Sequence, residues 1–237
     1  MAKEFSVTKQ QTLLITGANR GIGLEYVRQY ADEGWRVIAC CRAPQQASEL
    51  QRLAEGRAQI TIQALDVADF DQIEALGRTL TDQAVHLLIN NAGVYPQSTF
   101  RHIDYAQWAQ AFQINTMSTL KLAEVFIPHL VQAGNAKLVA MTSKMGSIDD
   151  NTSGGEYLYR STKTALNMVI KSLSHDLNKY GISTAALHPG WVRTDMGGPN
   201  GLIDTETSVR GLRKVIANLS LNSSGKFIAY DGKQIPW

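Results

Sequence analysis

The chain's most informative stretch is Leu13-Leu14-Ile15-Thr16-Gly17-Ala18-Asn19-Arg20-Gly21-Ile22-Gly23, where an apolar run meets a glycine-rich turn, and an amphipathic segment follows over residues 24–33. Strand, glycine turn and helix in this order are typical of a nucleotide-phosphate site. Glycines let a pyrophosphate approach main-chain N–H groups at a helix N-terminus. The spacing is G-x-x-x-G-x-G rather than the commoner G-x-G-x-x-G, so this turn alone could also be one without a ligand.

The rest of the chain repeats the strand-and-helix alternation. Such alternation predicts an α/β protein with an open parallel sheet. We expect a single-domain Rossmann fold over residues 1–237, with a doubly wound parallel seven-stranded sheet and helices on both faces. After the first strand, further strands are expected at residues 35–41, 58–65, 85–89, 136–141, 182–187 and 226–230. Helices are expected at residues 24–33, 44–56, 69–83, 104–129, about 156–180 and 205–218.

Composition narrows the class of protein. Of 237 residues, 44% are hydrophobic and 19% charged, which is enough to build a substantial core. The net charge of +2 does not favour an extended nucleic-acid surface. Residues 1–10 are polar, and no run resembles a signal peptide or reaches the length of a membrane span. We therefore expect a cytoplasmic protein that binds neither nucleic acid nor membrane.

Cysteines and histidines give no sign of a disulfide or a metal site. Cys40 and Cys41 are adjacent in an expected buried strand, where side chains alternate in direction and a mutual disulfide is awkward. Reduced thiols are the simpler interpretation. The five histidines are scattered without ligand spacing, so no metal site is expected.

The end of the second expected strand indicates which dinucleotide would bind. In a dinucleotide-binding unit this position faces the adenosine ribose, where an acidic residue would accept hydrogen bonds from the 2′-hydroxyl of NAD. Here Arg42 stands there instead, and Arg20 in the glycine turn supplies a second cation. Guanidinium groups suit a 2′-phosphate, so the sequence favours NADP(H) over NAD(H).

Other polar residues follow the remaining strands. Asp66 and Val67, the run Asn90-Asn91-Ala92-Gly93, and Ser143 all come directly after a strand. Carboxyl ends of parallel strands lie at one edge of the sheet, where ligands bind. Asn115 is an amide in an otherwise apolar helical stretch.

The run Tyr159-Arg160-Ser161-Thr162-Lys163 places a phenol and an ammonium one helical turn apart. At about 4 Å and an effective dielectric of about 20, their interaction is worth about 4 kcal/mol, or roughly three pKa units. Lys163 is therefore expected to lower the pKa of Tyr159, so that the phenol can exchange a proton with a substrate oxygen. Such a pair by itself is usually only an exposed surface pair.

Taken together, these motifs resemble the short-chain dehydrogenase/reductase family over essentially the whole chain. The matching elements are TGANRGIG at residues 16–23, LDV at 65–67, NNAG at 90–93, Asn115, Ser143, YRSTK at 159–163 and HPGWVRTDMGG at 188–198. The resemblance implies a catalytic tetrad of Asn115, Ser143, Tyr159 and Lys163. Ser143 would polarise a carbonyl, Tyr159 would donate the proton and Lys163 would also hold the nicotinamide ribose. Asn115 would link Lys163 to solvent through its main chain and a water.

The resemblance, together with the strand-end positions, predicts the cofactor-binding residues. They are Gly17, Asn19, Arg20, Gly21, Ile22, Gly23, Arg42, Asp66, Val67, Asn91, Ala92, Gly93, Tyr159, Lys163, Pro189, Gly190, Val192 and Thr194. The family's usual interface implies a homodimer or homotetramer built on the helices that carry Asn115 and Tyr159.

Within the family, the long interval between Ser143 and Tyr159 and the ending of the chain resemble the subgroup of C-factor-like proteins and the insect carbonyl reductase called sniffer. The long interval leaves Ser147 as an alternative to Ser143. Tyr95 and Trp191 lie on elements that could border the substrate.

Three functions fit this pattern. The first is reduction of a ketone or aldehyde with NADPH, with a small carbonyl or alcohol as the partner molecule. The second is a signalling or regulatory protein that binds NADP(H) with little turnover. The third is alcohol oxidation, which uses the same groups in reverse. The sequence does not identify the substrate.

Overall fold

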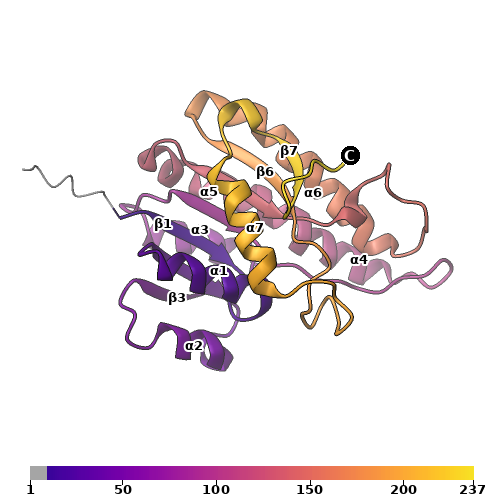
Figure 1. Ribbon diagram of the computed structural model, residues 1–237, viewed down its shortest axis with the longest axis horizontal. Helices are drawn as coiled ribbons and strands as arrows, with labels where there is room; N and C mark the ends of the chain where they lie inside the picture. Colours follow the sequence, from indigo (N-terminus) through magenta and orange to yellow (C-terminus); the bar gives the residue numbers. More distant parts are fainter. Residues whose placement is uncertain (1–9) are drawn as a thin grey trace, which may run out of the picture.

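The computed structural model describes residues 10–237, and the polar segment and predicted domain start at residues 1–9 lie outside the described residues. Seven strands form one parallel sheet in the order β3-β2-β1-β4-β5-β6-β7 (Figure 1). The strands are β1 Thr12–Thr16, β2 Arg36–Cys41, β3 Ile60–Ala64, β4 Leu87–Asn90, β5 Lys137–Met141, β6 Ser183–His188 and β7 Lys226–Ala229. The predicted doubly wound α/β fold is confirmed, and each strand lies within two residues of its expected bounds.

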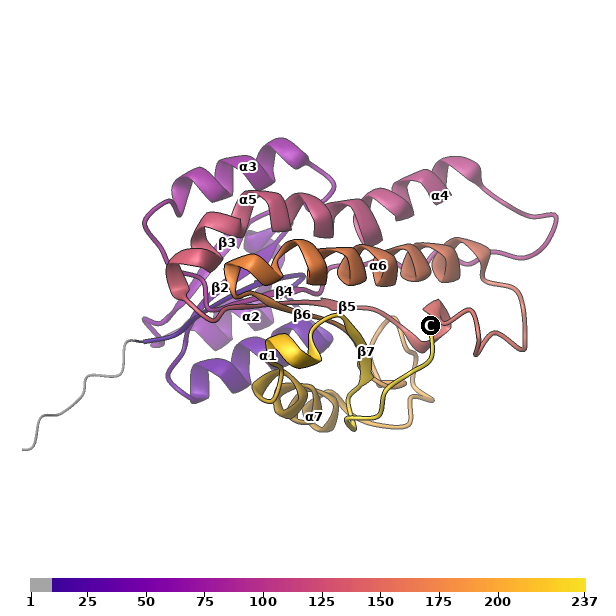
Figure 2. The same cartoon turned by 90° about the horizontal axis from the view of Figure 1, so that it is seen from above.

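Helices cover both faces of the sheet (Figure 2). They are α1 Gly21–Asp32, α2 Ser48–Ala54, α3 Phe70–Thr79, α4 Tyr105–Phe112, α5 Ser118–Ala133, α6 Tyr157–Asp176 and α7 Thr205–Ala217. Alternate strand residues enter two separate cores. In β1, Leu14 joins the core beneath α3, α5 and α6, whereas Leu13 and Ile15 join the core beneath α1, α2 and α7.

The two adjacent cysteines follow the same alternation. Cys40 lies in one core and Cys41 in the other, and both are buried free thiols. The two thiols do not face each other, because neighbouring residues of a strand point to opposite faces of the sheet.

The chain order creates a crevice at the middle of the sheet. From β1 the chain builds outward through β2 and β3, and then returns to place β4 on the other side of β1. At such a reversal the crossover helices diverge, and the carboxyl ends of β1 and β4 border an open space. The candidate site lies there.

The expected helix over residues 104–129 differs most from the structure. It is divided by a π-helical turn, Gln113–Met117, and the second part continues past Pro128 to Ala133. Pro128 removes one helical hydrogen bond, yet the helix continues because Leu122, Phe126 and Leu130 are buried on the same face. The expected helix at residues 44–56 is likewise shorter, a single 3₁₀ turn at Pro44–Gln46 followed by α2.

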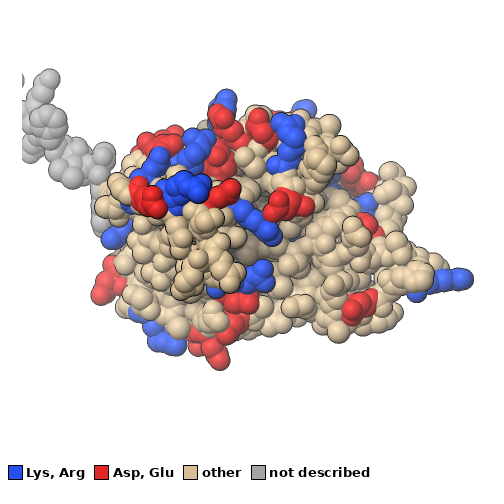
Figure 3. All heavy atoms as spheres, turned by 90° about the horizontal axis from the view of Figure 1, so that it is seen from below, with Lys and Arg blue, Asp and Glu red and all other residues tan. Residues whose placement is uncertain are grey.

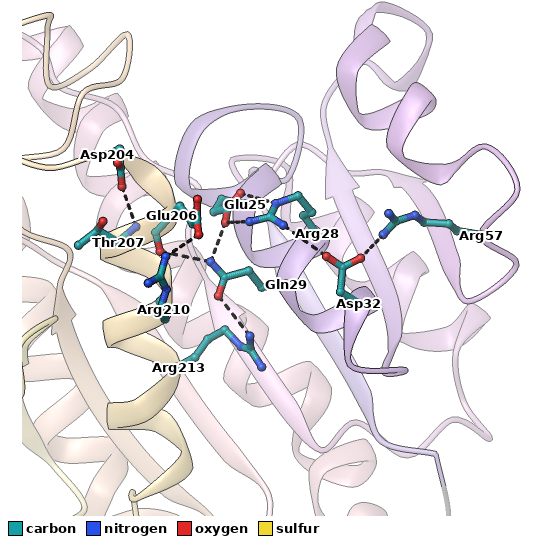
Figure 4. A network of polar contacts seen from close by, with 10 residues as sticks. All are labelled: Glu25, Arg28, Gln29, Asp32, Arg57, Asp204, Glu206, Thr207, Arg210 and Arg213. Carbon is teal, nitrogen blue, oxygen red and sulfur yellow. Dashed lines mark hydrogen bonds and ion pairs between the residues drawn. The ribbon is translucent and has the colours of Figure 1, made fainter.

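A polar network joins α1 to α7 (Figure 4). Gln29 donates to Glu25 Oε1 at 2.6 Å and to the main-chain oxygen of Glu206 at 3.3 Å, and it accepts from Arg213 Nη1 at 3.2 Å. The Arg213 guanidinium also lies 4.6 Å from the centre of the Tyr30 ring. Because α1 follows the glycine turn, these contacts with α7 help to fix the position of that turn.

Charged side chains of both signs are interspersed over the face drawn in Figure 3. Within residues 10–237, no helix combines the length and hydrophobicity needed to cross a bilayer. Over the same residues, no three His, Cys, Asp or Glu side chains gather closely enough to hold a metal ion.

Candidate active site

A cleft at the carboxyl edge of the sheet has a volume of about 570 Å³ and extends from the glycine turn to Tyr159 and Lys163. This volume is within the range of small-molecule and cofactor sites. Sixteen of the predicted site residues line the cleft: Gly17, Asn19, Arg20, Gly21, Ile22, Gly23, Arg42, Asp66, Val67, Asn91, Ala92, Gly93, Tyr159, Lys163, Pro189 and Thr194.

The glycine turn packs so closely that one position excludes any side chain. A Cβ atom at Gly23 would lie 2.1 Å from the main-chain oxygen of Gly17. Arg20, the residue before α1, makes no side-chain cap to the helix. The first N–H groups of α1 are therefore available to an anion in the cleft.

Thr16 and Asn91 fasten the glycine turn to the end of β4. Thr16 Oγ1 accepts from the N–H groups of Asn91 at 3.1 Å and Ala92 at 3.0 Å. The Asn91 side-chain amide donates to the main-chain oxygens of Thr16 and Gly17, each at 3.0 Å. Asn91 thus shapes the cleft, and Thr16 is a supporting residue that the sequence prediction did not include.

Both predicted arginines line the cleft. Arg42 is exposed, whereas Arg20 Nη1 lies 2.9 Å from Asp195 Oδ2. Both members of that ion pair are largely exposed, so it adds little stability and a more highly charged anion can compete for Arg20. Glu49 of α2 also lines the cleft and adds a negative charge that the sequence did not predict.

Tyr159 and Lys163 lie one turn apart on α6, and both are buried. Lys163 Nζ donates to the main-chain oxygen of Met141 at 2.9 Å and lies 5.7 Å from the centre of the Tyr159 ring. Burial lowers the pKa of Lys163 to about 8. An ammonium in this position therefore loses its proton more easily than a solvated lysine.

The pKa of Tyr159 moves opposite to the predicted direction. Burial raises it to about 12, and a hydrogen bond with Ser143 offsets only part of that rise. Burial penalises the phenolate more than the neighbouring groups stabilise it, so the phenol keeps its proton at neutral pH.

Ser143 follows β5, and its hydroxyl accepts from the N–H of Met145 at 3.1 Å. The alternative, Ser147, is buried and occupied elsewhere. It donates to the main-chain oxygen of Trp237 at 3.2 Å and accepts from the N–H of Asp150 at 3.1 Å. Because Ser143 is the serine that hydrogen-bonds Tyr159, the structure favours it over Ser147.

Asn115 lies in the π-helical turn, a feature that often marks functional sites. Its side chain exchanges hydrogen bonds with the main chain of Val94, at 2.8 Å and 3.0 Å, and donates to Thr162 Oγ1 at 3.0 Å. A Cβ atom at Gly93 would lie 3.2 Å from Asn115 Oδ1 and 3.5 Å from Lys163 Nζ. Asn115 Oδ1 and Lys163 Nζ therefore both lie close to Gly93.

Four predicted residues do not line the cleft: Asn115, Ser143, Gly190 and Val192. Asn115 lies close to Gly93, as Lys163 does, and Ser143 hydrogen-bonds Tyr159. The Val192 side chain is buried, and its main chain pairs with Ile203. Gly190 faces away from the cleft, since a Cβ there would lie 2.9 Å from Ile203 and Tyr230 side-chain atoms.

Ten lining residues were not predicted from the sequence: Cys41, Glu49, Leu65, Val94, Ile114, Met141, Thr142, Arg193, Asp195 and Met196. Most are immediate chain neighbours of predicted residues. Glu49 has no such signal, because its place depends on how α2 packs.

The doubly wound fold with a glycine turn at its carboxyl edge is typical of a nucleotide-binding oxidoreductase. The family model described as short chain dehydrogenase matches residues 11–202. The chain belongs to the short-chain dehydrogenase family.

Two relatives show how far the likeness extends. The chain is 44% identical over 154 residues to C-signal of Myxococcus xanthus, covering 65% of this chain and 93% of that protein. It is 37% identical over 237 residues to 1-hydroxy-2-glutathionyl-2-methyl-3-butene dehydrogenase of Rhodococcus sp. (strain AD45), covering 95% and 99%.

Solved structures of carbonyl reductases are also similar to this chain over almost its whole length. The NADPH-bound carbonyl reductase from chicken fatty liver superposes with a TM-score of 0.91 at 36% identity, covering 97% of this chain and 100% of that one. The carbonyl reductase Sniffer of D. melanogaster superposes with a TM-score of 0.90 at 35% identity, with the same coverage. The predicted resemblance to this subgroup is confirmed.

Proposed function

We propose that this protein reduces a ketone or aldehyde to an alcohol with NADPH, and that Tyr159 is the general acid. The observation that carries the proposal is a buried phenol beside Lys163 and Ser143, at one end of a cleft whose other end is a glycine turn. A neutral phenol can donate a proton, and a hydroxyl beside it can polarise a carbonyl.

The residues of the cleft fit NADPH. Uncapped N–H groups at the start of α1 suit a pyrophosphate, and Arg20 and Arg42 suit a 2′-phosphate. Lys163 would hold the nicotinamide ribose, with Asn91, Pro189 and the main chain near Val192 completing the site. The NADPH-bound carbonyl reductase from chicken fatty liver, with its high structural similarity, supports this cofactor.

When bound in the cleft, NADPH would supply the hydride that the carbonyl carbon accepts. Ser143 Oγ hydrogen-bonds the carbonyl oxygen, and Tyr159 Oη gives that oxygen its proton, so that the product is a neutral alcohol. The Lys163 ammonium stabilises the phenolate that remains. Asn115, whose side chain lies close to Gly93 as Lys163 Nζ does, would hold the path by which solvent restores the proton.

The test is NADPH oxidation over a panel of aldehydes and ketones, with wild type and Tyr159→Phe. General acid catalysis contributes about 10²- to 10⁴-fold, so we expect turnover by wild type and a loss of that size in the variant. NADPH binding to the variant, measured by fluorescence, checks that its cleft is intact. Equal rates in both proteins would remove Tyr159 from the proposed role.

Two alternatives use the same site differently. A signalling role is suggested by the likeness to C-signal, but that role would not require the Tyr159-Lys163 pair. Tight NADPH binding without turnover of any carbonyl would favour the signalling role. Alcohol oxidation would run the same steps in reverse, and a higher kcat/KM for alcohols with NADP⁺ would favour that direction.

A further inference from the structure

A short turn follows Ser143 and leads into the loop before α6. Residues 144–146 form a single 3₁₀ turn, and the Gly146 N–H donates to the Ser143 main-chain oxygen at 2.8 Å. The Ser147 N–H donates to the Lys144 main-chain oxygen at 3.0 Å. The position of the Ser143 hydroxyl therefore depends on what holds this turn against the rest of the molecule.

Helix α6 holds one side of the turn. The Gly146 main-chain oxygen accepts from Thr164 Oγ1 at 2.9 Å and from Asn167 Nδ2 at 3.2 Å. The turn and the helix approach so closely that a Cβ atom at Gly146 would lie 2.8 Å from the main-chain carbonyl carbon of Lys163. The turn is thus fixed to the helix that carries Tyr159 and Lys163.

Trp237 holds the residues at the other side of the turn. Its main-chain oxygen accepts from the N–H groups of Ile148 and Asp149, each at 3.0 Å, and from Ser147 Oγ at 3.2 Å. Ser147 is itself buried. Three donors from consecutive residues therefore converge on one oxygen that lies 90 positions farther along the chain than Ser147.

The segment after β7 turns back along that strand and is fixed to it. The Ala229 N–H donates to the Lys233 main-chain oxygen at 2.8 Å, and the Ile235 N–H donates to that of Phe227 at 2.9 Å. The Trp237 ring stacks on the Phe227 ring, with centres 5.7 Å apart and 25° between the planes. Phe227 is fully buried in the core beneath α6, so the stacked ring holds the Trp237 main chain where its oxygen meets residues 147–149.

We propose that Trp237 is a positioning residue for the proposed carbonyl reduction, on which this inference rests. Trp237 does not line the cleft, and it acts through Ser143. Its ring is fixed by the core, its main-chain oxygen fixes residues 147–149, and those residues hold the turn so that the Ser143 hydroxyl stays beside Tyr159. Accurate placement matters because a shift of about 1 Å in a catalytic group can cost about 100-fold in rate.

The first test measures kcat with NADPH and the carbonyl compound that wild type reduces fastest, in wild type, Trp237→Ala and Trp237→Phe. Loss of one polarising donor costs about 10²- to 10³-fold, and a displaced donor loses part of that, so kcat should fall roughly tenfold in Trp237→Ala. Trp237→Phe keeps a ring that can stack on Phe227, so its kcat should stay within about twofold of wild type. The KM for NADPH should not change in either variant, because Trp237 lies outside the cleft.

Tyr180→Ala is the matched control for loss of an aromatic ring. Tyr180 is 43% exposed and Trp237 is 42% exposed, but Tyr180 precedes β6 and so lies at the opposite edge of the sheet from the cleft. Its removal should leave kcat unchanged.

A double-mutant cycle separates positioning of Ser143 from a general effect on the fold. In a Ser143→Ala background, Trp237→Ala should change kcat by less than about twofold, because residues that act through one group have non-additive effects. Ser147→Ala removes one of the three hydrogen bonds to Trp237 and leaves the ring in place. It should likewise lower kcat when Ser143 is present and not when Ser143 is absent.

Equal losses of kcat with and without Ser143 would overturn the positioning role, as would an unchanged kcat in both Trp237→Ala and Ser147→Ala. Failure of wild type to reduce any carbonyl compound would contradict the proposed function and this inference with it. Reduction by wild type with additive losses in the cycle would contradict this inference alone.

Discussion

Tyr159 and Lys163 share one buried environment, but burial moves their pKa values in opposite directions. The pKa of the phenol rises to about 12 and that of the ammonium falls to about 8. Burial penalises whichever form is charged, which is the phenolate for tyrosine and the ammonium for lysine. At pH 7 the free protein thus holds a protonated phenol beside a largely protonated lysine.

The lowered pKa of Lys163 predicts how NADPH affinity depends on pH. As the pH rises through about 8, Lys163 in the free protein loses its proton, and the cofactor loses a charged hydrogen-bond donor. We expect fluorescence titrations to show NADPH affinity falling above pH 8 in wild type. Lys163→Met should bind about tenfold more weakly at pH 7 and should not show that fall. The same decline in both proteins would exclude Lys163 as its cause.

Arg42 is the residue that should separate NADPH from NADH. A hydrogen bond to a charged group contributes about 1.5–3 kcal/mol, so Arg42→Ala should lower NADPH affinity about 10- to 100-fold and leave NADH affinity nearly unchanged. Arg36→Ala is the matched control, because Arg36 is exposed at the opposite end of β2. Equal losses for both cofactors in Arg42→Ala would contradict recognition of the 2′-phosphate by this residue.

At the scale of elements, His188 at the end of β6 links the sheet to the turn that follows Ser143. The Lys144 N–H donates to His188 Nδ1 at 3.2 Å, which requires an unprotonated nitrogen. Burial, and then the charge of Lys144, lower the pKa of His188 to about 4. Protonation of His188 would therefore break the contact that supports this turn.

The consequence is a loss of stability in acid. Because the folded pKa of about 4 lies below the unfolded value near 6.5, the unfolded chain takes up this proton first as the pH falls. His188 should then lower the free energy of unfolding by roughly 3 kcal/mol between pH 6.5 and pH 4. Urea unfolding should show a shallower acid decline in His188→Asn than in His175→Asn, which alters an exposed histidine of α6. Parallel declines would contradict this.

The strands could be predicted from the sequence because most of them are short buried apolar runs, and their carboxyl ends located most of the cleft. Three features depend on tertiary contacts that no local pattern carries. The π-helical turn forms where Asn115 bonds to Val94, and Glu156 adopts a left-handed conformation because Ser98 holds it. The raised pKa of Tyr159 reflects burial, which the spacing of Tyr159 and Lys163 does not encode.

At the scale of the whole molecule, α5 and α6 lie side by side on one face of the sheet (Figure 2). Leu120 on α5 is 41% exposed and Met168 on α6 is 66% exposed. Exposed apolar side chains on neighbouring helices suit burial against a second copy.

We therefore expect a homo-oligomer assembled through α5 and α6. Light scattering after gel filtration should give at least a dimer for wild type and a monomer for the double variant Leu120→Glu, Met168→Glu. Leu202→Glu is the control, because Leu202 is 76% exposed but lies in the loop before α7. A monomeric wild type, or a double variant that stays oligomeric, would contradict this interface.

The central claim, hydride transfer to a carbonyl assisted by Tyr159, is tested most directly with NADPH deuterated at C4 of the dihydronicotinamide. Mass spectrometry of the alcohol formed from an aldehyde should find deuterium on the carbinol carbon with wild type. Tyr159→Phe should form that alcohol at least about 100-fold more slowly. Oxidation of the deuterated NADPH without deuterium in the alcohol, or equal alcohol formation by both proteins, would contradict the account.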